Sequence, residues 1–255
     1  MTETPAVPSW PRPYWQAGGD AKAMLQFYVF GAFRPELAIP ARNYGSPGLP
    51  AGVEIQRFQN AVLRKWEGWP LGGSLGALLR EDTPEAFETA RLAPDVLVLR
   101  GELDDPATLD YLRDTLGVLA GMLDAGASAI LDPQILTLFD ATHWRRHYLV
   151  KGGAPPRHHA LILSSEDGGG RHWVHTRGMR KFARPDISLV NVPGVELERA
   201  GVLAEKLVEL LALGARFDAD QPLEVDGLAA PLFARPGGDL DDPRFNNLHV
   251  EFRWP

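Results

Sequence analysis

The chain has no cysteine and lacks the segments that direct a protein to a membrane. Without cysteine among its 255 residues, disulfides, thiol catalysis and cysteine-ligated zinc or iron–sulfur centres are excluded. No apolar run approaches the ~20 residues that a membrane span requires. The opening residues also lack a basic segment followed by an apolar one, as a signal peptide would have. We therefore expect a cytoplasmic protein with no membrane partner.

Positive charge is also scarce, and the common phosphate-binding and nucleophile motifs are missing. The 26 basic residues are outnumbered by 33 acidic ones, which gives a net charge of −7. Because phosphate affinity needs a concentrated basic surface, this balance disfavours nucleic acid as a partner. The sequence has no G-x-x-x-x-G-K-S/T loop, no G-x-G-x-x-G and no G-x-S-x-G elbow. We predict no cofactor.

Hydrophobic periodicity predicts an α+β fold. Residues 94–103 form a continuous apolar strand, 105–126 a helix begun by Asp105 and Pro106, and 127–132 a second strand. The helix carries a leucine seam at Leu109, Leu112, Leu116, Leu119 and Leu123. Further predicted elements are strands at 22–33, 158–165, 171–176, 186–192 and 246–255, and helices at 53–69, 82–93 (capped by Thr83) and 194–214.

These elements suggest two similar strand–helix–strand halves packed as one domain, with long helices on a mixed or antiparallel sheet. We expect an extended arm over 1–15, a first half over 16–150 and a second half over 151–255. Both long helices contain the string GVLA, which indicates a duplication. The alternative is that two leucine-rich helices resemble each other by chance.

The stretch HWVHTRGMRKFARPD, from residue 172 to 186, concentrates basic side chains in a tight connection. Its cations are Arg177, Arg180, Lys181 and Arg184, which could bind an anion or an acidic partner. We expect Trp173 and Phe182 to be anchors packed in the core while Arg177 and Arg180 stay at least partly exposed, since burial of an unpaired guanidinium is costly. The alternative is a solvated turn that pairs with the protein's own carboxylates.

Four residues are weak catalytic candidates: His175, His249, Glu251 and Asp132. His249 and Glu251 share one face of a predicted strand and could form an acid/base pair, although surface alternation gives the same pattern. Asp132 ends a buried strand, where ligands collect in α/β sheets, but Asp-Pro also opens turns. His143 and His147 have helical spacing, yet no local third ligand is present, so we predict no metal site.

The segments GELDDPATLDYLRDTLGVLAGMLDAGASAILDPQ and HTRGMRKFARPDISL resemble an uncharacterised, largely bacterial protein family. That family joins two α/β halves and carries a His-Thr-x-Gly…Pro-(Asp/Glu) segment in the second. It usually has glycine where this chain has Ala183, so a special backbone angle there would imply a different turn. The resemblance implies a fold plan and no chemistry.

The sequence favours a non-catalytic binding protein, of a partner-binding or immunity type, that uses the arginine-rich turn. The partner would be another protein or an anionic small molecule. The alternative is a hydrolase or transferase that holds an anionic substrate with Arg177 and Arg180 and moves a proton with His175. Convergence of His175, Arg177, Asp132 and His249 in one pocket would favour the enzyme.

Overall fold

The computed structural model describes residues 8–59 and 66–255, and it has an α+β fold. The chain divides into two compact units. The first contains residues 8–11 and Met24–Ala154, and the second contains Arg12–Ala23 and Pro155–Pro255. The division after Ala154 lies close to the boundary expected at residue 150. Each unit has its own five-stranded sheet.

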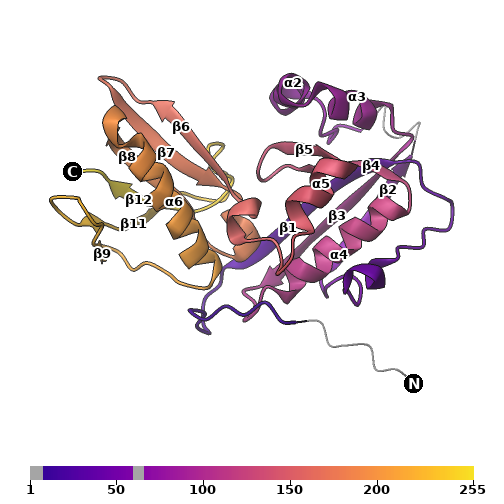
Figure 1. Cartoon of the computed structure of the whole chain (residues 1–255), viewed down its shortest axis with the longest axis horizontal. Helices are drawn as coiled ribbons and strands as arrows, with labels where there is room; N and C mark the ends of the chain where they lie inside the picture. Colours follow the sequence, from indigo (N-terminus) through magenta and orange to yellow (C-terminus); the bar gives the residue numbers. More distant parts are fainter. Residues whose placement is uncertain (1–7, 60–65) are drawn as a thin grey trace. The chain divides into compact units, whose positions relative to one another are not determined.

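The first unit is built on a sheet with strand order β2-β3-β1-β4-β5. Its strands are β1 (Lys22–Gly31), β2 (Val53–Gln59), β3 (Asp95–Asp104), β4 (Ala127–Asp132) and β5 (Thr137–Asp140). Its helices are η1 (Ala41–Tyr44), α2 (Gly73–Asp82), α3 (Pro84–Leu92), α4 (Asp110–Asp124) and α5 (Ala141–Tyr148). Figure 1 shows α4 lying along this sheet.

Alternation along β1 separates the two faces of the first sheet. One face carries Leu25, Phe27 and Val29, which are fully buried, whereas Gln26 and Tyr28 on the other face are partly exposed. The five seam leucines of α4 are all buried, at 0–7% exposure, which confirms the predicted apolar stripe. A second apolar cluster joins Phe30, Val96 and Val98 to side chains of α2 and α3, so these helices cover part of the sheet.

The second unit has a sheet of order β11-β12-β8-β7-β6. Its strands are β6 (Leu161–Glu166), β7 (Arg171–Arg177), β8 (Asp186–Pro193), β11 (Arg235–Gly237) and β12 (His249–Arg253), and β9 (Pro222–Leu223) pairs with β10 (Leu232–Phe233). Its helices are η2 (Pro156–His159), η3 (Met179–Phe182), η4 (Gly194–Glu196) and α6 (Leu197–Ala212). Helix α6 packs on β7 and β8, and Val174, Ile187 and Leu189 are buried.

Two local predictions are wrong, and a third holds only in part. Residues 53–59 of the predicted helix 53–69 instead form β2, which pairs with residues 101 to 95 of β3. Pairing within the sheet therefore overrides the helical spacing. Residues 60–65 of the predicted helix lie outside the described residues. Thr83 occupies the N-cap position of α3 as predicted, but its side chain makes no capping hydrogen bond, since its hydroxyl donates to the Leu79 carbonyl. Helix α4 begins at Asp110 rather than after Asp105. At this start, the Asp110 carboxylate accepts a hydrogen bond from Trp10 N.

The two sheets differ in connectivity, which argues against a simple duplication. Helix α4 links β3 to β4, two strands that lie on either side of β1. After α6 the chain instead passes through the short strands β9, β10 and β11 before it reaches β12, which pairs with β8 directly and in parallel. The shared GVLA string therefore lies in helices that connect different pairs of strand positions.

No helix in the described part of the chain has the length and apolar character needed to span a bilayer.

Candidate functional site

The basic turn of the second unit points inward. Arg177, Lys181 and Arg184 are 8%, 0% and 3% exposed, and only Arg180 is partly exposed. The expectation that Arg177 stays exposed is therefore wrong. Its guanidinium donates to the carbonyls of Pro243 and Arg244, and the Lys181 ammonium donates to the His159 carbonyl at 3.0 Å. These main-chain acceptors make burial of the cations tolerable.

Arg184 has a structural task at the end of α6. It donates to the carbonyls of Gly214 and Ala215 at 2.8 and 2.9 Å, and Arg12 donates to the Ala212 carbonyl at 2.9 Å. The last carbonyls of a helix have no partner within the helix and form its negative end. Since the last turn of α6 carries no basic residue of its own, these two distant arginines supply the positive charge.

The His-Thr-x-Gly…Pro-Asp segment forms a hydrogen-bonded hub around Asp186. This fully buried carboxylate accepts from Thr176 Oγ1 at 2.8 Å, from Met179 N at 3.3 Å and from Asn247 Nδ2 at 2.8 Å. Burial raises the pKa of Asp186 to about 7, and these hydrogen bonds and Arg177 act in the opposite direction. With no exposed surface, Asp186 holds the turn together and is closed to a solute.

Ala183 takes the left-handed conformation, with φ of 53°, which favours glycine. A left-handed alanine costs about 1–2 kcal/mol. Glycine would relieve this strain, but it would add unfolded-state entropy of about 0.4–1 kcal/mol and remove a buried methyl group that contributes about 0.8 kcal/mol.

We expect Ala183→Gly to change the free energy of unfolding by less than about 0.5 kcal/mol, because these contributions offset one another. Ala77→Gly, on the exposed face of α2, should cost about 1 kcal/mol. Urea titration of both variants measures the contrast. Equal losses in the two variants would show that the backbone angle at Ala183 carries no strain.

His175 and His249 do come together, around Phe245. The His175 ring is 5.7 Å from that of Phe245, and His249 stacks on Phe245 at 4.6 Å. Trp173 covers His175 at 3.7 Å, and Trp173 itself is only partly buried. Burial, with Arg177 and Arg244 nearby, lowers the pKa of His175 to about 4. Such an imidazole is neutral and weakly basic at pH 7, which suits packing better than proton transfer.

The remaining candidates have other positions. Asp132 belongs to the first unit and is 1% exposed, and it accepts from Gln134 N at 3.1 Å, as a turn opener does. Glu251 pairs in register with Ser188, as His175 does. Its carboxylate acts to raise the pKa of His249, but burial is the larger effect and lowers it. No three metal-ligating side chains of the described residues are grouped to hold a metal ion.

A pocket that the sequence did not reveal lies on the first sheet, on the face that carries Tyr28. Its volume is about 460 Å³, within the usual range for small-ligand sites. It is lined by Gln26, Tyr28, Gly52, Glu54, Gln56, Phe58, Trp66, Val98, Arg100 and Gly101, mostly from β1, β2 and β3. Gly101 is needed on this floor, since a Cβ there would lie 2.3 Å from the Gly52 carbonyl oxygen.

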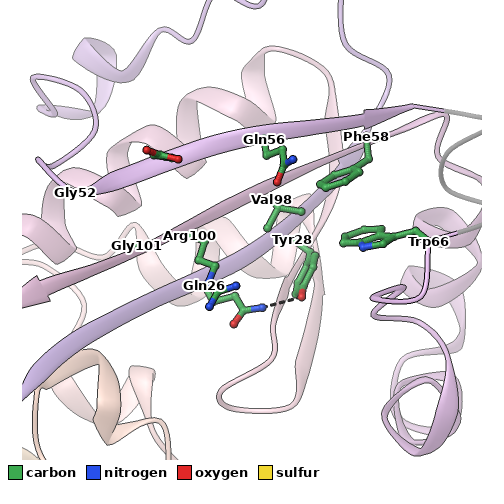
Figure 2. Close-up of a pocket in the computed structure, with 10 residues that line it drawn as sticks. Gln26, Tyr28, Gly52, Gln56, Phe58, Trp66, Val98, Arg100 and Gly101 are labelled. Carbon is green, nitrogen blue, oxygen red and sulfur yellow. Dashed lines mark hydrogen bonds between the residues drawn. The ribbon is translucent and has the colours of Figure 1, made fainter.

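The pocket has an aromatic end and a polar end (Figure 2). Phe58 and Trp66 stack with centroids 4.2 Å apart, and Tyr28 lies 6.0 Å from Trp66. Gln26 donates to the Tyr28 hydroxyl at 2.7 Å. At the polar end, Glu54 and Arg100 are register partners on neighbouring strands, and among the described residues neither side chain forms a hydrogen bond or an ion pair.

A signal for this pocket was present in the sequence. In VEIQRFQ, the residues Glu54, Gln56 and Phe58 alternate with Val53 and Ile55, which is the period of a strand with one solvated face. The helical spacing that begins at Ile55 masked that alternation. The cavity itself could not be inferred, because three strands distant in sequence form it.

Comparison with protein-family models, with curated proteins and with solved structures finds no match for this chain.

Proposed function

We propose that this protein is a binding protein whose site is the pocket on the first sheet, and that its ligand is a small molecule with a flat apolar group. The observation that carries the proposal is the stacked pair Phe58 and Trp66 beside an open cavity of about 460 Å³. Aromatic walls supply large apolar area for a flat ligand, and a few polar groups fix its orientation.

The lining favours binding over catalysis. The residues described around the pocket include one carboxylate, Glu54, and no histidine, lysine or serine, so a nucleophile with an adjacent base is missing from them. In the second unit, His175 and Arg177 are buried, so a substrate would reach them poorly, and this favours a binding protein over a hydrolase or transferase. The arginine-rich turn is not proposed as the binding surface, because three of its four cations are buried. The proposal retains the cytoplasmic location suggested by the sequence.

The test uses two neutral aromatic probes, indole and phenylacetamide, with saturation-transfer NMR to detect binding. We expect both probes to bind the wild-type protein. Gln56→Trp should raise the Kd at least about tenfold, because Gln56 is exposed at the pocket floor and a larger ring there fills the cavity. Leu92→Trp places the same side chain on an exposed position of α3 and should leave binding unchanged.

The proposal is overturned if neither probe binds, or if Gln56→Trp and Leu92→Trp bind both probes as tightly as the wild type. Circular dichroism of both variants confirms that the fold is retained.

A further inference from the structure

We infer that the pocket selects a zwitterion, and that its ligand is an aromatic α-amino acid or a compound with the same paired charges. This inference rests on the proposed function, and it adds the chemical class of the ligand. It stands on the strand register, which pairs Glu54 with Arg100 four residues along β2 from Phe58, and on the place of both residues in the pocket lining.

Glu54 and Arg100 carry opposite charges on two neighbouring strands. They are direct register partners on β2 and β3 and project from the same face of the sheet. Opposite charges at such positions commonly pair with each other. Here both side chains are exposed, and within the described residues neither forms an ion pair. Both charges are therefore available to a ligand.

The two charges together discriminate against ligands that carry only one. A simple carboxylate that approached Arg100 would meet the negative charge of Glu54, and a simple amine at Glu54 would meet the guanidinium. A ligand with an ammonium group and a carboxylate on one carbon satisfies both. Specificity then comes from repulsion as much as from attraction.

The charged and aromatic ends of the pocket are well separated along β2. Glu54 and Phe58 are four residues apart on β2, which corresponds to about 13 Å along the strand. The Arg100 side chain is long and flexible, so it shortens this span from the charged end. Gln56 lies midway, and Gln26 reaches the Tyr28 hydroxyl, so amide groups line the path between the charges and the rings.

The experiment compares L-phenylalanine with its two single-charge analogues, 3-phenylpropionate and 2-phenylethylamine, by isothermal titration calorimetry. We expect L-phenylalanine to bind the wild-type protein about tenfold more tightly than either analogue. Arg100→Gln should abolish the advantage over 2-phenylethylamine, and Glu54→Gln the advantage over 3-phenylpropionate. Arg146→Gln and Glu81→Gln remove the same charges from exposed positions of α5 and α2 and should change neither ratio.

The outcomes separate this inference from the proposed function. If indole and phenylacetamide bind but L-phenylalanine has no advantage over its analogues, the pocket binds aromatic molecules and the zwitterion inference is wrong. The same holds if the advantage survives both pocket variants. If no probe of either set binds, both proposals are wrong. Loss of the corresponding advantage in each pocket variant, with unchanged ratios in the controls, supports the inference.

Discussion

Replacing Arg184 with alanine should lower the free energy of unfolding by about 3–5 kcal/mol, which is the range for loss of one partner from a buried charged network. The side chain is 3% exposed and donates to three carbonyls, those of Ala183, Gly214 and Ala215. Removing it leaves these acceptors buried without that donor and takes a positive charge from the negative end of α6.

Two further variants locate the cause of the Arg184 effect. Arg184→Lys keeps the charge but cannot reach three carbonyls in different directions, so its loss should be intermediate. Arg253→Ala removes an exposed arginine of β12 and should cost less than about 0.5 kcal/mol. Urea titration gives the free energies, and hydrogen exchange of residues 197–212 should rise in Arg184→Ala. Unchanged stability of Arg184→Ala would show that the basic turn is no internal brace.

The basic turn illustrates how far sequence reasoning reaches. The cluster was recognised from its composition, but the direction of its side chains was not predictable. Their acceptors are carbonyls of Gly214, Pro243 and His159, which are 22 to 66 residues away in the chain. A solvated basic turn and a buried brace have the same local sequence, since only tertiary structure brings those carbonyls into reach.

Elements with strong local signals were predicted well. The strand 127–132 agrees with β4 at both ends, and the predicted strands 158–165 and 171–176 correspond to β6 and β7. Predictions were less accurate at helix starts. Helix α4 begins at Asp110, whose carboxylate accepts a hydrogen bond from Trp10 N, and this contact between residues far apart in the sequence leaves no local signal. The candidate pocket depends on strand order, and neighbouring β1 and β3 are separated by more than sixty residues. Local periodicity therefore shows the solvated face of β2 but not the cavity.

Replacing Leu116 with alanine should lower the free energy of unfolding by about 2–5 kcal/mol. Leu116 lies mid-way along α4 with 3% exposure, and Leu112 and Leu119 flank it on the same buried stripe. The loss combines the transfer energy of the deleted atoms with the cavity left behind, which a helix held by its whole seam can close only in part.

Two leucine variants serve as comparisons in the same urea titration. Leu116→Met nearly conserves volume and should cost less than about 1.5 kcal/mol. Leu92→Ala deletes the same atoms from a side chain that is 69% exposed on α3, and its effect should stay within about 0.5 kcal/mol. A loss below about 0.5 kcal/mol for Leu116→Ala would place this face of α4 in solvent in the folded protein. In that case α4 would not cover its face of the first sheet. Within the described residues, the opposite face, which carries the pocket, would then no longer be the one open face of the sheet.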